Sequence, residues 1–217
     1  MEQARSGQSV FTVIGGPNGA GKSTYTDRLA AAGYDLGEVV NADVIAAALP
    51  EPDTTRDARA GRETLHRTRS LIAGGHTFSR ETTLSGREIL RTMQAAKGAG
   101  FRINLFFVGV DSLETSRRRV EDRISEGGHG IPRLVQERRF GRSFDNAVRA
   151  ARTADTTVFV HSRDQAFQSV GMARRGVMAW RVDMPGLQWL DRITEGLARS
   201  ASMGRRRSGG DIGHERI

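Results

Sequence analysis

The chain has 217 residues, of which 37% are hydrophobic and 27% are charged, which is enough for one α/β domain with a sizeable core. It contains no cysteine, which excludes disulfides and thiolate metal sites. No apolar run has the length of a signal peptide core or a transmembrane helix, so we expect a cytoplasmic protein with no membrane contact. The net charge of +8 comes almost entirely from arginine, since Lys22 and Lys97 are the only lysines, and it is spread along the chain without interleaved aromatic residues. Nucleic-acid binding is therefore not expected as the main function.

Predicted strands and helices alternate along the chain. Apolar or β-branched runs predict strands at residues 9–14, 38–40, 76–81, 101–110, 156–160 and 177–182. Helical spacing of apolar residues and glycine stops predict helices at residues 22–32, 53–73, 87–99, 113–125, 134–154 and 187–197. This alternation predicts an α/β fold with a mostly parallel sheet covered on both faces and ligands at the carboxyl ends of the strands. We expect a single domain over residues 1–202 and a basic, disordered tail over residues 203–217.

The first strand is followed by a phosphate-binding motif, G-x-x-x-x-G-K-[ST], over residues 16–23. Its glycines let the backbone fold around a phosphate, Lys22 reaches the β- and γ-phosphates, and the Ser23 hydroxyl can ligate Mg²⁺. The chain has no N-K-x-D motif in the expected region, so ATP is favoured over GTP. The residues predicted to bind the nucleotide are Gly16, Pro17, Asn18, Gly19, Ala20, Gly21, Lys22, Ser23 and Thr24.

Motor and transporter ATPases need further motifs, which this chain carries only in part. Asp111 follows an apolar strand, as in a Walker B motif, but no glutamate comes after it. The segment TLSGREI over residues 83–89 is a partial echo of the ABC signature LSGGQ, too close to that strand to serve as one. A small kinase is the better interpretation.

A kinase needs a carboxylate that accepts the proton of the acceptor hydroxyl, and Asp43 is the candidate because it follows the second predicted strand. The alternative is that Asp43 caps a helix beginning at Val44. Glu81, Thr82 and Thr83 end the next strand. These groups could bind sugar hydroxyls or help to place Mg²⁺, or they could form a capped turn.

Arginines on two predicted helices flank a glycine-rich loop over residues 126–132. Such a pair of helices is typical of a lid that brings positive charge over the γ-phosphate, although exposed arginines often only face solvent. The candidates are Arg119, Arg123, Arg138 and Arg139.

Together these segments resemble the zeta toxin family of bacterial kinases. The matching segments are GGPNGAGKST, NAD with Asp43, RETTLSG and the more specific block RVEDRISEGGHGIPRLVQERRFGRSFDN over residues 119–146. The resemblance implies a P-loop kinase-like three-layer sandwich with an arginine-bearing helical lid. It also implies Mg²⁺- and ATP-dependent phosphorylation of the 3′-hydroxyl of the sugar in UDP-N-acetylglucosamine, by the toxin of a toxin–antitoxin pair.

The same resemblance implies roles for single residues. Lys22 and Ser23 would bind ATP and Mg²⁺, and Asp43 would act as the base. Arg123 would contact the γ-phosphate, with either Arg138 or Arg139 as its partner. The sugar-binding wall would include Glu81, Thr82 and Thr83, and His129 in the lid loop would serve either the substrate or the structure.

Two departures from the family and two alternative functions remain open. Fewer than ten residues precede the first predicted strand, where the founding toxins carry extra residues and are blocked by an antitoxin. His161 stands where similar proteins carry an asparagine that contacts adenine. The alternatives are a P-loop phosphotransferase acting on another small molecule, such as a nucleoside or an antibiotic, and a nucleic-acid-associated ATPase.

Overall fold

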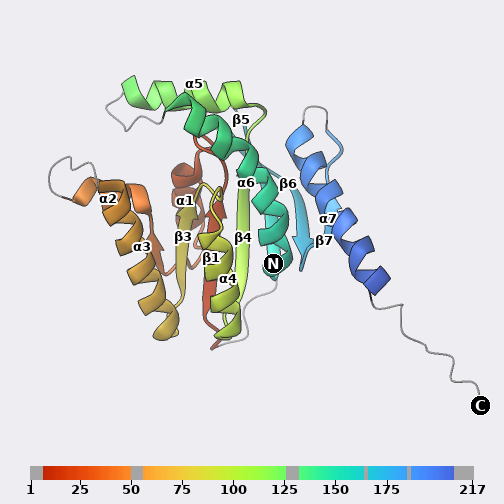
Figure 1. Cartoon of the computed structure of the whole chain (residues 1–217), viewed down its shortest axis with the longest axis horizontal. Coiled ribbons are helices and arrows are strands. Elements are labelled where there is room, and N and C mark those ends of the chain that lie inside the picture. The colour runs from red at the N-terminus through yellow and green to blue at the C-terminus, as the bar shows by residue number, and fades with distance from the viewer. Residues whose placement is uncertain (1–6, 50–55, 126–131, 164–165, 185–186, 208–217) are drawn as a thin grey trace, which may run out of the picture.

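The structure is a computed structural model that describes residues 7–49, 56–125, 132–163, 166–184 and 187–207. One or two helices follow each of the strands β1 to β4, and β5 is followed by a strand hairpin and a last helix (Figure 1). In chain order the elements are β1 (Val10–Gly15), α1 (Lys22–Ala31), β2 (Glu38–Val40), α2 (Ala42–Ala48), α3 (Arg56–Ala73), β3 (Phe78–Thr82), α4 (Glu88–Gly98), β4 (Arg102–Gly109), α5 (Leu113–Ser125), α6 (Arg133–Thr153), β5 (Thr156–Arg163), β6 (Ala166–Arg174), β7 (Val177–Arg181) and α7 (Gln188–Arg207).

The described strands form one 7-stranded sheet in the order β2-β3-β1-β4-β5-β6-β7. The strands from β2 to β5 pair in parallel, whereas β6 and β7 continue the sheet antiparallel. The predicted α/β class with a mostly parallel sheet is thus confirmed. This strand order places β1 between β3 and β4, so the loop after β1 emerges beside the carboxyl ends of both neighbours.

Successive residues of the central strands point to opposite faces of the sheet and enter different cores. Phe11 and Val13 of β1 belong to the larger cluster, whereas Ile14 belongs to the smaller one. In β4, likewise, Phe107 faces the larger cluster and Val108 the smaller one. Both faces of the sheet are therefore covered, as parallel sheets require.

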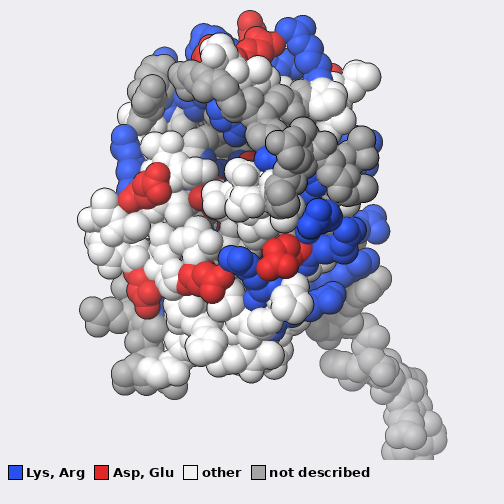
Figure 2. Space-filling view, turned by 90° about the vertical axis from the view of Figure 1, so that its left-hand side faces the viewer, with Lys and Arg blue, Asp and Glu red and all other residues white. Residues whose placement is uncertain are grey.

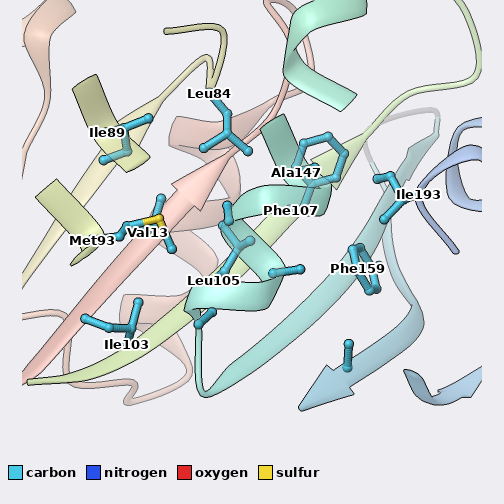
Figure 3. Close-up of a cluster of buried hydrophobic side chains, with 14 of the residues drawn as sticks. Val13, Leu84, Ile89, Met93, Ile103, Leu105, Phe107, Ala147, Phe159 and Ile193 are labelled. Carbon is cyan, nitrogen blue, oxygen red and sulfur yellow. The ribbon is translucent and has the colours of Figure 1, made fainter. Parts of the chain in front are cut away.

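The larger core lies under α4, α6 and α7 (Figure 3). Figure 3 shows Met93 of α4 over Val13, and Ala147 of α6 close to Phe107, whose side chain is fully buried. The smaller core packs Tyr25 and Leu29 of α1 against the opposite face. The result is the predicted three-layer arrangement, with α5 and the start of α6 crossing one end of the sheet in Figure 1.

The C-terminal part differs from the sequence prediction in two elements. The strand β6 was not predicted, because its polar and glycine residues do not form an apolar run. The helix α7 continues to Arg207, beyond the expected domain end at residue 202. The division into domain and tail stays a prediction. None of the helices in the described ranges is long and apolar enough to cross a bilayer.

Candidate active site

The loop between β1 and α1 depends on glycines at two places where no side chain fits. Gly16 has φ 152°, and a Cβ there would lie 2.1 Å from the Val108 carbonyl oxygen of β4. Gly19 has φ 70°, and its Cβ would lie 2.6 Å from the Ser116 carbonyl oxygen of α5. The loop is therefore held between β4 and α5, in the strand–loop–helix context that the motif requires.

Lys22 begins α1 and folds back over the loop. Its Nζ donates a hydrogen bond to the Pro17 carbonyl oxygen at 3.0 Å. Burial lowers the pKa of Lys22 to about 8, while the carboxylates of Glu81 and Asp43 oppose this shift and the Arg123 guanidinium adds to it. These three charged groups, which come from β3, α2 and α5, thus act on one lysine.

Glu81 at the end of β3 connects the loop to β2. Its Oε2 accepts hydrogen bonds from the Ser23 hydroxyl at 2.8 Å and from Asn41 Nδ2 at 3.0 Å. The parallel register pairs Ile14 of β1 with Glu81, which brings the carboxylate beside the phosphate-binding loop. A hydroxyl and a carboxylate oxygen in contact form the kind of donor set that Mg²⁺ prefers.

Asp43 lies in the first turn of α2 and is exposed. The helix begins at Ala42, and its N-cap is Asn41, whose Oδ1 accepts from the backbone N–H groups of Asp43 at 2.8 Å and Val44 at 3.4 Å. The alternative in which Asp43 caps a helix beginning at Val44 is therefore wrong. The Asp43 carboxylate is not used as the cap and acts on Lys22 through its charge.

Thr82 ends β3, and Thr83 follows it in the connection to α4. The Leu84 N–H donates to Thr82 Oγ1 at 3.0 Å, and Thr83 Oγ1 lies 2.9 Å from Ser85 Oγ. Leu84 is buried and has φ 56°, and Asn146 Nδ2 of α6 donates to its carbonyl oxygen at 2.8 Å. The capped-turn interpretation thus accounts for both hydroxyls, and their role in binding a substrate stays a prediction.

Two of the predicted lid arginines lie one turn apart on α5 and make different contacts. Arg123 is exposed, and its charge acts on Lys22. Arg119 is half-buried and donates to the Gly19 carbonyl oxygen at 3.4 Å and to Ser162 Oγ at 2.9 Å. The lid role of Arg123 therefore stays a prediction, whereas Arg119 connects α5 to the loop and to β5.

The structure distinguishes Arg138 from Arg139, which the sequence spacing could not. Arg139 is half-buried and precedes Asn146 by about two helical turns, so both side chains leave α6 on the side of the turn after β3. Arg138 is exposed, and its place one residue earlier turns it about 100° around the helix from Arg139. Arg139 is thus the better candidate for the second phosphate contact. His129, with the rest of residues 126–131, lies outside the described residues.

His161 lies inside β5, which extends beyond the predicted strand end to Arg163. Its side chain is buried, and Nε2 is 3.1 Å from Asp111 Oδ1 at the end of β4. Burial lowers the pKa of His161, and Asp111 opposes the shift. The ring also stacks on Trp189 of α7 with centroids 6.4 Å apart. These contacts give His161 a packing role, and the adenine contacts stay a prediction.

Sequence reasoning missed the polar residues that hold the candidate catalytic groups. Asn41 was read only as part of the NAD segment, although it links Glu81 to the start of α2. Ser116 and Gln136 fall on predicted helices, and nothing in the helical pattern marked them. The signal that could have found Asn41 is its place directly before a helix, where asparagine is a preferred cap.

The surface around α2 and α3 carries charges of both signs. Figure 2, seen from this side, shows Lys and Arg gathered toward its right, with Asp and Glu lying mainly toward the left and centre. The face is hollowed in its upper part, and basic and acidic atoms are both visible inside the hollow. This mixture differs from the continuous basic stripe of a nucleic-acid-binding face.

The loop, the strand order and the helices crossing the carboxyl end of the sheet define a P-loop kinase-like α/β fold. A family model described as an AAA domain (AAA_33) matches residues 11–143, which is more than half of the chain, and the protein belongs to this family. An uncharacterized protein of Haemophilus influenzae (strain ATCC 51907 / DSM 11121 / KW20 / Rd) is 32% identical over 127 residues, covering 58% of this chain and 88% of that protein.

Solved structures with the same fold include chains of two protein complexes or systems. A chain of the AvrRxo1-ORF1:-ORF2 complex with ATP superposes with a TM-score of 0.64 at 16% identity, over 86% of this chain and 64% of that chain. The protein thus spans less than two thirds of that neighbour. A chain of the PezAT chromosomal toxin-antitoxin system of Streptococcus pneumoniae superposes with a TM-score of 0.60 at 16% identity, over 91% of this chain and 88% of that chain. At these identities the likeness shows the fold.

Proposed function

We propose that the protein is an ATP- and Mg²⁺-dependent small-molecule kinase of zeta-toxin type. Its acceptor would be a sugar hydroxyl of UDP-N-acetylglucosamine or a related UDP-sugar, and its cellular role that of a toxin with an antitoxin partner. The observation that carries the kinase proposal is the set of charges that act on Lys22, since Asp43, Glu81 and Arg123 come from separate elements. A loop that only holds a nucleotide does not need them.

Mg²⁺ fits the residues beside the loop. Ser23 and Glu81 would hold it, since their oxygen atoms are 2.8 Å apart, and Mg²⁺ commonly takes one or two protein oxygens together with substrate phosphates. When bound, the ion would neutralise phosphate charge. Among the described residues no cluster of three acidic, histidine or cysteine side chains offers a metal site.

The remaining groups divide the work of phosphoryl transfer. Lys22 would leave the Pro17 carbonyl oxygen for the β- and γ-phosphates. Asp43 would accept the acceptor proton as the hydroxyl attacks, while Arg123 and Arg139 would stabilise charge on the transferred group. The UDP-sugar and the antitoxin are supported by the resemblance of residues 119–146 to zeta toxins and, for the antitoxin, by the fold shared with PezAT.

The test is incubation of the full-length protein with ATP, Mg²⁺ and a panel of nucleotide sugars, nucleosides and antibiotics, read by mass spectrometry for the gain of one phosphate. Asp43→Asn should reduce transfer by about 10²–10⁴-fold while ATP binding persists. Asp27→Asn is the matched control, because Asp27 is an exposed carboxylate on α1. Transfer by Asp43→Asn at the unaltered rate would contradict the assigned base, and phosphate on another acceptor would replace the UDP-sugar.

A further inference from the structure

The helix α5 contacts the phosphate-binding loop through its backbone and two polar side chains. Its Ser116 carbonyl oxygen occupies the space where Gly19 would carry a Cβ, so helix and loop touch directly. The Ser116 hydroxyl is fully buried and donates to the Asn18 carbonyl oxygen at 2.7 Å. One turn later, Arg119 donates to the next carbonyl along the loop, that of Gly19, at 3.4 Å.

These bonds fix the direction of the peptide groups in the loop. A trans peptide unit is planar, so its N–H points opposite to its C=O. No cis peptide occurs in the described residues. Because the Asn18 carbonyl is held toward α5, the Gly19 N–H in the same plane is directed away from the helix. A loop that binds phosphate through N–H groups needs this orientation before the ligand arrives.

Arg119 is itself held from a third element. Its guanidinium also donates to Ser162 of β5, from Nη1 to Oγ at 2.9 Å and from Nη2 to the carbonyl oxygen at 3.3 Å. Arginine presents several N–H groups in a rigid fork, which suits this bridging role better than lysine. Arg119 thus joins the loop, α5 and β5.

A second link runs from Ser116 to α6. Gln136 is 3% exposed, and its Nε2 donates to Ser116 Oγ at 3.1 Å. The serine hydroxyl therefore accepts from Gln136 and gives its one proton to the Asn18 carbonyl oxygen. Arg139 follows Gln136 by about one turn of α6, so this chain of bonds connects the loop to the helix of the second candidate phosphate contact.

We propose that Ser116 and Arg119, with Gln136 behind them, are positioning residues that hold the loop ready for nucleotide and fix both arginine-bearing helices relative to it. The inference rests on the nucleotide binding contained in the proposed function, and it gives Arg119 a positioning role in place of the predicted contact with the γ-phosphate. None of the three needs to touch the transferred phosphate. Their effect is on the affinity for ATP, through peptide groups whose direction they set.

The test measures the dissociation constant of ATP by calorimetry on full-length variants. Arg119→Ala should raise it about tenfold or more, because bonds from a charged donor to Gly19 and Ser162 are lost. Arg118→Ala, an exposed arginine of the same helix, should leave it unchanged. Arg119→Lys keeps the charge without the fork and should fall between these two.

The hydrogen bonds from Gln136 to Ser116 and from Ser116 to the Asn18 carbonyl oxygen predict that substitutions of Gln136 and Ser116 have coupled effects on ATP affinity. Gln136→Leu keeps the volume and should raise the dissociation constant a few-fold, through Ser116. In a Ser116→Ala background the same change should have no further effect. Additive effects, or unaltered ATP affinity in folded Arg119→Ala and Ser116→Ala, would overturn the inference.

Failure of this inference and failure of the proposed function give different results. If the unaltered protein binds ATP but phosphorylates no acceptor, the proposed function fails, and the positioning residues are still tested by affinity. If it phosphorylates an acceptor while the variants bind ATP equally well, only the positioning role fails. Absence of ATP binding by the unaltered protein would overturn both.

Discussion

In the proposed site, the donor side (the loop between β1 and α1) and the acceptor side (Asp43, Glu81 and Arg123) are built differently. On the donor side the backbone does the work, because Gly16 and Gly19 have positive φ and lie against β4 and α5 where no side chain fits. On the acceptor side, side chains from α2, β3 and α5 converge. A continuous motif can encode the first side, whereas the second exists only after the chain has folded.

The strand order explains how the acceptor side is assembled. Because β3 lies between β2 and β1, the ends of these strands bring Asp43, Glu81 and the loop together. The hydrogen bonds of Glu81 to Ser23 and Asn41 tie the two sides to each other. Changes on the donor side should therefore remove nucleotide binding, and changes on the acceptor side should remove transfer while binding persists.

The largest expected effect comes from Lys22→Ala. Loss of the charge that meets the β- and γ-phosphates should lower turnover at least about 10²-fold and weaken ATP binding. Burial lowers the pKa of Lys22 to about 8, which means that the folded protein disfavours its charge. The melting temperature of the variant should thus equal or exceed that of the unaltered protein, as measured by calorimetry. A clear drop would show that the lysine supports the fold rather than the ligand.

An intermediate effect separates the two arginines of α6. Arg139→Ala should lower the rate of phosphoryl transfer about 10²-fold, because this half-buried side chain leaves the helix on the side of the turn after β3. Arg138→Ala should change the rate no more than about twofold, as expected for an exposed position. The measurement is the transfer rate at saturating ATP. Equal losses in both variants would mean that α6 turns differently in the working enzyme.

The smallest expected effect is a pH dependence of nucleotide binding through Lys22. With a pKa of about 8, Lys22 loses its proton as the pH rises from 7 to 9, so the affinity for ATP should fall about tenfold by pH 9. Calorimetry in buffers of different ionisation enthalpy should detect proton uptake on binding at pH 9. Lys22→Arg keeps its charge and should give a flat profile. A flat profile in the unaltered protein would contradict the role of the lowered pKa.

The two sides also differ in how well the sequence predicted them. The nucleotide loop and the α/β class were predictable, because glycine spacing and apolar runs report backbone shape directly. The conformation of Thr82 and Thr83 was left open, since it depends on Asn146 of α6, which holds the turn from a distance. The choice between Arg138 and Arg139 needed the register of α6, which a one-residue difference in sequence spacing cannot supply.

Other features could not be predicted from the sequence, because they depend on contacts between segments that are far apart in the chain. His161 resembles a residue after a strand, but pairing with β6 extends β5 past it and buries its ring beside Trp189. The strand β6 itself lacks an apolar run, and none of its first four residues is buried. Asn41 was the exception, because a cap has a local signal that could have been used.

The core under α6 and α7 has a consequence for where the protein can be divided. The family match ends at residue 143, inside α6. Phe107 of β4 packs against Phe144 and Trp189 with ring centroids 5.5 and 5.7 Å apart, and both partners lie beyond that point. The residues matched by the family model therefore do not contain the whole core of the protein. A fragment that ends at residue 143 would keep every candidate catalytic side chain, but it would lose Phe144 and Trp189 and so expose the apolar side chain of Phe107.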